Sequence, residues 1–375
     1  MESGDLGSWM LSTPRTVRTA GPGQTVAADP GPGQFARLAR RAREELRRAA
    51  DGQAVVGALP FDERTPAALT LTRIRTRRRP AHTCIGPPLP TAPPCGDPAY
   101  GEAVATAVAH CREGTLGKVV LARSLLLPGP GPDRLPAVLG RLRCQQPTAY
   151  VFRVELAPGL PGPPRLLFGA SPELLLVRHG DRVLLNPLAG SAVRHPDRVR
   201  DRAAARALLA SRKDRGEHAV VVAEVARRLG PLCTRLDVPA VPSLRATGQL
   251  WHLSTTLRAR LRHPAPDALE LAAALHPTPA VCGLPRGTAR QLIEELEAGP
   301  RDYYTGLVGW MDGHGDGQWV IALRCAELSD RGLRLYAGAG VVADSTPDGE
   351  LAETDAKLST LLAALSPALP APTRG

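Results

Sequence analysis

The sequence contains no run of about 18 uncharged apolar residues, the length that a membrane-spanning helix needs. Its first 30 residues also lack the order of basic and then apolar residues that marks a secretory signal. Hydrophobic residues make up 43% and charged residues 22% of the chain, as in ordinary globular proteins. We therefore expect a folded protein of the cytoplasm that has no membrane partner.

Cysteine never occurs in a C-x-x-C pair, which argues against a zinc ribbon or a thioredoxin-like redox centre. A small buried hydrophobic side chain is the ordinary role of an isolated cysteine. We expect reduced thiols at all seven positions, which are Cys84, Cys95, Cys111, Cys144, Cys233, Cys282 and Cys325.

Aromatic residues are only 3% of the chain, which leaves few rings for stacking on nucleic-acid bases. The net charge is +11, but residues 291–357 carry 13 acidic and 5 basic side chains. This acidic part would repel a phosphate backbone and suits a hard cation instead. A basic nucleic-acid-binding protein is therefore only a remote alternative, and we expect no nucleic-acid partner.

Lysine is scarce, since only Lys118, Lys213 and Lys357 accompany 44 arginines. Such a bias is typical of GC-rich coding, under which a surface cation is written as arginine. A lysine then persists where an amine is needed, because an ammonium can lose its proton when desolvated and a guanidinium cannot. Lysines left by chance would be scattered anywhere, but all three lie within dense motifs.

Composition and periodicity divide the chain into three parts. Residues 1–99 are expected to form the N-terminal part of the fold, with a Gly/Pro-rich start, a helix at 35–50 and a strand at 54–59. Residues 100–366 are expected to form the catalytic core, and residues 367–375 a disordered tail.

Within the core, long strands alternate irregularly with helices, which favours an α+β fold over a series of βαβ units. The helices are predicted at 102–112, 198–229 and 347–365. The strands are predicted at 118–127, at 165–176 paired with 182–187, and as a hairpin at 306–326 and 333–343.

The last predicted helix concentrates charge on one face. Glu350, Glu353 and Lys357 are spaced at i, i+3 and i+7, so two carboxylates and an amine lie side by side next to a glycine-rich strand end. Taken alone, this pattern also fits an ordinary solvated face.

Two further carboxylates stand out by their surroundings. Glu173 interrupts an apolar run, and burial would raise its pKa as a general acid requires. Glu217 lies between Gly216 and His218 in a charged segment of the long predicted helix, where a glycine costs about 1 kcal/mol against alanine and so needs a reason. An exposed strand or helix face is the alternative for both.

Together these segments resemble the chorismate-utilising enzymes, specifically their isochorismate synthase branch. The resemblance covers nearly the whole chain through motifs in the family's order, at 11–16, 56–62, 117–123, 187–191, 213–218, 251–253, 275–281, 306–310 and 336–358. It implies a single large α+β domain in which two antiparallel sheets pack face to face with helices outside. The site would lie between the sheets.

By the same resemblance, the substrate would be chorismate and the product isochorismate. Lys118 would be the general base that activates water for attack at C2, and Glu173 the general acid that protonates the departing C4 hydroxyl. Glu217 and Glu353, with Glu350 acting through water, would hold Mg²⁺ against the ring carboxylate. Oxygen ligands and retained waters are usual for this ion.

The resemblance also implies substrate contacts. Arg324 and Tyr304 match positions that grip the enolpyruvyl carboxylate, and Gly338 matches a backbone contact to the same region. Lys357 would place a charge near the carboxylates and the metal. More remote site residues are His252 and Thr278, for which structural support is the stronger alternative.

Two other reactions of the family stay open. A salicylate synthase also eliminates pyruvate, but that branch tends to carry a hydroxyl residue where this chain has Ala280. An ammonia-using synthase of the anthranilate or aminodeoxychorismate type typically lacks the lysine found at Lys118 and depends on a glutaminase partner. We therefore expect an isomerase with no obligatory protein partner, whose product serves siderophore, menaquinone or salicylate synthesis.

Overall fold

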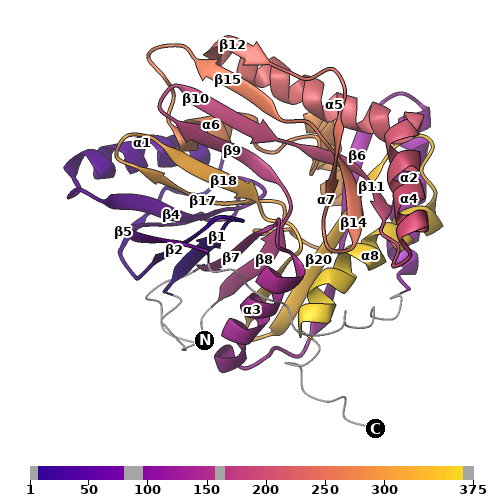
Figure 1. Ribbon diagram of the computed structural model, residues 1–375, viewed down its shortest axis with the longest axis horizontal. Helices are drawn as coiled ribbons and strands as arrows, with labels where there is room; N and C mark the ends of the chain where they lie inside the picture. Colours follow the sequence, from indigo (N-terminus) through magenta and orange to yellow (C-terminus); the bar gives the residue numbers. More distant parts are fainter. Residues whose placement is uncertain (1–6, 80–95, 157–164, 366–375) are drawn as a thin grey trace.

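The long apolar runs of the sequence form antiparallel strands in two large sheets that share β5 (Figure 1). The structure is a computed structural model that describes residues 7–79, 96–156 and 165–365. In these residues the first sheet has the order β5 (Ala68–Arg78), β2 (Thr16–Ala20), β1 (Trp9–Ser12), β7 (Tyr150–Glu155), β8 (Leu166–Ser171), β19 (Cys325–Ser329), β20 (Gly332–Val341), β6 (Lys118–Leu127) and β16 (Gly283–Leu284).

The second sheet is antiparallel at every pairing as well. Its order is β3 (Gln24–Val26), β5, β4 (Gln53–Leu59), β17 (Leu307–Asp312), β18 (Gly317–Ile321), β9 (Leu174–His179), β10 (Arg182–Asn186), β15 (Leu257–Leu261) and β12 (Cys233–Asp237). A small third sheet joins β11 (Leu188–Val193), β14 (Leu250–Ser254) and β13 (Ser243–Ala246).

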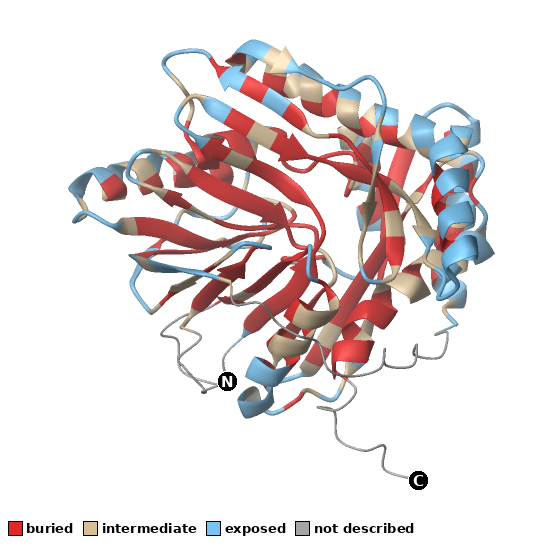
Figure 2. Ribbon diagram, in the orientation of Figure 1, coloured by how far each residue is buried: buried red, intermediate tan, exposed pale blue. Residues whose placement is uncertain are grey.

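Helices cover the outer faces of the sheets. The second sheet carries α1 (Gln34–Arg48) and α6 (Ala268–Leu275), and the first carries α3 (Leu135–Gln145) and α8 (Pro347–Leu365). The β6 end of the first sheet is covered by α2 (Pro98–Arg112) and α7 (Arg286–Leu296), and the third sheet by α4 (Arg198–Ala210) and α5 (Arg212–Leu229). Figure 2 shows the resulting pattern, with buried strands inside and helices exposed on their outer sides.

Apolar side chains from both sheets meet between them. Trp9, Leu11 and Phe152 of the first sheet pack in one cluster with Val56 and Val308 of the second. This arrangement confirms the predicted fold class, a single α+β unit with two antiparallel sheets face to face and helices outside.

Three predicted elements are shorter in the structure than the periodicity suggested. The helix predicted at 198–229 breaks at Ser211, whose hydroxyl accepts from the Asp214 amide (3.2 Å) and caps α5. The strand predicted at 306–326 is divided into β17, β18 and β19, and the strand at 165–176 into β8 and β9. Glu173 lies between β8 and β9, so its side chain does not follow the regular alternation of a strand.

The expectation that all cysteines are reduced is wrong for Cys144, which is disulfide-bonded. Spacing along the chain does not tell which cysteines the fold brings within bonding distance. Free thiols that are buried occur at Cys111, Cys233, Cys282 and Cys325. Cys84, Cys95 and the predicted tail at 367–375 lie outside the described residues.

Within the described ranges, none of the helices combines the length and the apolar character that crossing a membrane requires.

Candidate active site

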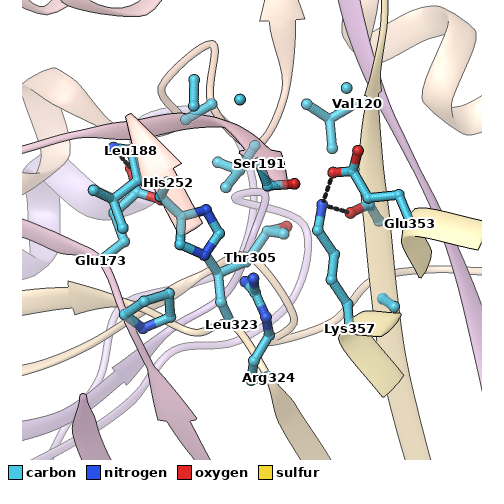
Figure 3. A pocket seen from close by; sticks show the side chains of 18 of the residues that line it. Val120, Glu173, Leu188, Ser191, His252, Thr305, Leu323, Arg324, Glu353 and Lys357 are labelled. Atoms are coloured by element: carbon cyan, nitrogen blue, oxygen red, sulfur yellow. Dashed lines mark hydrogen bonds and ion pairs between the residues drawn. The ribbon is translucent and has the colours of Figure 1, made fainter. Parts of the chain in front are cut away.

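A polar pocket lies where β6 and β20 of the first sheet face the small third sheet and the beginning of α8 (Figure 3). Of the residues predicted for the site, nine line this pocket: Glu173, Glu217, His252, Ala280, Tyr304, Arg324, Gly338, Glu353 and Lys357. The other three, Lys118, Glu350 and Thr278, are not among the residues that line it. The fold thus gathers most of the predicted set, from segments nearly 200 residues apart.

Glu173 is the most deeply placed carboxyl group of the pocket. It is 3% exposed, and the backbone amide of Leu188 donates to its Oε1 (3.4 Å). Burial raises its pKa to about 7, against the opposing effects of the Leu188 hydrogen bond and the charges of Lys118 and Arg324. At neutral pH the group is therefore about half protonated and able to donate a proton.

Lys118 is the first residue of β6 and is 1% exposed. Its Nζ lies 2.7 Å from Oε1 of Glu217, which faces the pocket from α5. Gly340 on β20 leaves room for this ion pair, because a Cβ there would stand 2.6 Å from Glu217 Oε1 and 2.9 Å from Lys118 Cε. A methyl group at Gly340 would therefore force this ion pair to shift.

Glu353 and Lys357 lie one turn apart on α8, as the spacing predicted. Lys357 Nζ is 2.5 Å from Glu353 Oε1 and donates to the Gly338 carbonyl (2.7 Å). Burial works to raise the pKa of Glu353, but the Lys357 charge and hydrogen bonds from Lys357 and Ser191 outweigh it, so this pKa is below its ordinary value. Glu353 therefore stays ionised.

Glu350 is 3% exposed and 3.5 Å from the Nζ of Lys213. Burial and the neighbouring charge of Glu353 both raise the pKa of Glu350. Two carboxylates thus repel each other beside the pocket, a situation that a cation would relieve.

Arg324 and Tyr304 form the opposite part of the wall. Arg324 follows β18 with a left-handed φ of 46°, and such a conformation is uncommon outside glycine and often marks a functional position. Burial raises the pKa of Tyr304, so its hydroxyl remains a hydrogen-bond donor, and its ring stacks on Tyr336 with centroids 5.0 Å apart. A guanidinium next to a phenol suits a carboxylate ligand.

His252 presents an imidazole to the pocket from β14 (Figure 3). Burial, then the charges of Arg324 and Lys357, hold its pKa well below the ordinary value, so the ring is neutral. Its Nε2 and the hydroxyl of Thr278 are buried and lack a hydrogen-bond partner in the described part of the chain. His252 is therefore able to bond a ligand in the pocket, whereas Thr278 does not line it.

Some lining residues were not predicted as site residues. Ser191 bonds Glu353, and Gly190, with φ 74°, would place a Cβ 2.9 Å from that of Asp214. Their motif at 187–191 was recognised in the sequence, but only the fold shows that it faces α8.

The described residues contain no group of three or more His, Cys, Asp or Glu side chains arranged to hold a metal ion. Glu217, Glu350 and Glu353 are each paired with a lysine instead, as described above. The pocket nevertheless is lined by one carboxylate from each of two helices, Glu217 of α5 and Glu353 of α8.

Comparison with known proteins gives concordant results. Residues 72–366 match the family described as chorismate binding enzyme. The chain is 42% identical to the isochorismate synthase DhbC of Bacillus subtilis, over 96% of this chain and 94% of that protein. It is 40% identical to the isochorismate synthase EntC of Escherichia coli, over 82% and 80%.

Solved structures extend the likeness to the fold. A crystal structure described as a putative 2,3-dihydroxybenzoate-specific isochorismate synthase, DhbC, from Bacillus anthracis superposes with a TM-score of 0.87 at 40% identity, covering 96% of each chain. Anthranilate synthase component I from Streptococcus pneumoniae, at 20% identity and a TM-score of 0.73 over 92% of each chain, shares the fold.

Proposed function

The chain belongs to the family of chorismate-binding enzymes, and on this premise we propose that it is an isochorismate synthase whose acid–base pair is Glu173 and Lys118. It isomerises chorismate to isochorismate. The observation that carries the mechanism is the buried Glu173 carboxyl group, whose pKa of about 7 lets it donate a proton at neutral pH.

The reaction is balanced by one water in and one water out. Lys118 in its neutral form takes a proton from water, whose oxygen forms a bond to C2 of the ring. The ring double bonds shift, and the C4–O bond breaks as Glu173 protonates the departing hydroxyl. The burial of both side chains supports these roles, because it keeps bulk water from competing for the proton.

The substrate carboxylates match the cationic part of the pocket. Arg324 and Tyr304 would bind the enolpyruvyl carboxylate, with the Gly338 backbone beside them. Lys357 is held against Gly338 and would add positive charge near the ring carboxylate. Neutral His252 would complete the polar lining with its unpaired nitrogen, while Thr278, whose hydroxyl is also unpaired, would be a more remote site residue outside the lining.

We further propose a Mg²⁺ ion held by Glu217 and Glu353, with Glu350 acting through water. The donor set fits, because carboxylate oxygens are the ligands that Mg²⁺ prefers and because Glu350 and Glu353 repel each other without a cation. When bound, the ion would neutralise these carboxylates and attract the ring carboxylate of the substrate. Glu217 would then exchange its present partner, Lys118, for the cation.

Two residues favour isomerisation over the other reactions of the family. Ala280 lines the pocket without a hydroxyl group, which disfavours a salicylate synthase. Lys118 is present as a base for water, which disfavours an ammonia-using synthase.

Product analysis tests the proposal. The purified protein is incubated with chorismate and Mg²⁺, and the products are separated by chromatography with a pyruvate assay alongside. We expect isochorismate without pyruvate. Salicylate and pyruvate as the main products would refute the proposed reaction, as would unchanged chorismate.

A further inference from the structure

Arg301 is a buried cation that stands outside the pocket but bonds several segments of its wall. Its side chain is 2% exposed and belongs to the loop between α7 and β17. Nη2 donates to the Val120 carbonyl (2.6 Å), and Nη1 donates to the Val281 carbonyl (2.7 Å) and to the Thr305 hydroxyl (3.4 Å). All three acceptors belong to residues that line the pocket, whereas Arg301 does not.

Glu297 completes this arrangement from the end of α7. Its carboxylate accepts from Nε (2.9 Å) and Nη2 (2.5 Å) of Arg301, and also from the backbone amide of Ala122 (2.8 Å). All five N–H donors of the guanidinium are thus in use. The group also lies over the ring of Phe61, 4.5 Å from its centroid, and 6.0 Å from that of Tyr304.

The three segments that Arg301 joins carry residues of the proposed reaction. Val120 follows Lys118 by two residues on β6, and Val281 directly follows Ala280. Thr305 directly follows Tyr304. One planar side chain therefore fixes the distances between the base, the residue that discriminates between reactions, and the phenol that binds the substrate.

We propose that Arg301, oriented by Glu297, is a positioning residue that sets the geometry of this wall of the active site. The inference rests on the proposed function, since Lys118 must reach the attacking water. A buried ion pair contributes little net stability compared with apolar residues of similar size. The planar guanidinium of Arg301 instead holds backbone carbonyls in place with its five N–H donors, which a flexible lysine cannot do.

Arg301→Lys in the full chain is the first test, with Arg178→Lys as the matched control. Arg178 is also buried, and its Nη1 bonds the His314 carbonyl (3.1 Å) and Asp316 (2.8 Å), neither of which lines the pocket. We expect both variants to lose similar amounts of thermal stability. Only Arg301→Lys should lower kcat, by roughly 10²-fold, because small displacements of reacting groups have effects of that size. KM for chorismate should change much less, since Arg324 and Lys357 remain in place.

Glu297→Gln provides a second variant that preserves side-chain volume. Like Arg301→Lys, it should lower kcat. If Arg301→Lys is recovered unfolded, Glu297→Gln alone tests the positioning role. Wild-type kcat in a folded variant at either position would overturn the proposal, and so would an equal loss of kcat in Arg178→Lys. Wild-type enzyme is assayed in parallel, so a failure of the proposed function is seen separately as the absence of isochorismate from the unaltered protein.

Discussion

Glu173→Gln isolates the proton that the proposed mechanism assigns to this residue. Glutamine keeps the size of the side chain and can still meet the Leu188 amide, but it has no proton of suitable acidity to donate. Chorismate should still bind, because Arg324 and Lys357 are untouched. Turnover should fall by roughly 10²–10⁴-fold, the usual contribution of a general acid.

The mechanism also predicts how the contribution of Glu173 to kcat changes with pH. The pKa of Glu173 is raised to about 7, so the protonated form is present below that pH and is lost above it. At pH 8 only about one-tenth of the group remains protonated, so the ratio of wild-type kcat to the kcat of Glu173→Gln should fall about tenfold for each pH unit above 7. The free energy of unfolding should also decrease as the pH rises from about 4.5 to 7 and level off above, because burial disfavours the charged form in the folded state.

The assay is a kcat–pH profile of wild type, Glu173→Gln and a control, Glu327→Gln. Glu327 on β19 is another buried carboxyl group with a raised pKa, but it pairs with Arg165, and neither residue lines the pocket. We expect kcat of wild type and of the control to decline above pH 7 relative to the small residual kcat of Glu173→Gln, which has no group titrating at this position. A Glu173→Gln enzyme with near wild-type kcat, or with the same alkaline decline, would show that another group protonates the hydroxyl.

Three further predictions concern the base, the cation and a glycine. Lys118→Arg keeps the charge but cannot become neutral, so it should lose most activity; a fully active variant would remove Lys118 as the base. EDTA should abolish turnover and Mg²⁺ restore it, and Glu353→Gln should raise the Mg²⁺ concentration needed; full activity in chelator contradicts the metal assignment. Gly340→Ala should impair turnover because the added methyl meets Glu217 Oε1 at 2.6 Å, while Gly287→Ala, which meets nothing within 4 Å, should not; equal activity of the two would show that the Lys118 pair tolerates displacement.

The fold class and most of the pocket could be predicted from the sequence because the motifs are long and stand in the family's order. Glu173 was found as a lone carboxylate in an apolar run, and the Glu353–Lys357 pair from helical spacing. The break at Ser211 was missed, because a serine can also lie within a helix. Here its hydroxyl accepts a hydrogen bond from the Asp214 amide and begins a new helix instead. The disulfide of Cys144 depends on a contact that spacing does not encode.

Arg301 shows a different limit of reading a sequence. Its neighbours along the chain are loop residues, and nothing local distinguishes it from the other arginines, which outnumber lysines so strongly here. Its role follows from three carbonyl and hydroxyl acceptors and one carboxylate, supplied by segments that meet only when both sheets are formed.

The scarcity of lysine becomes informative once the ion pairs are known. Nearly every cationic side chain of this protein is an arginine, and only three are lysines. In the structure, each lysine amine contacts a different carboxylate of the proposed metal site. A guanidinium is wider and forks toward two acceptors, so it would not fit the space beside Gly340, where atoms already approach within 2.6 Å of a hypothetical Cβ. The compact ammonium satisfies one carboxylate and can yield it to a competing cation. The three pairs are Lys118–Glu217 at 2.7 Å, Lys213–Glu350 at 3.5 Å and Lys357–Glu353 at 2.5 Å.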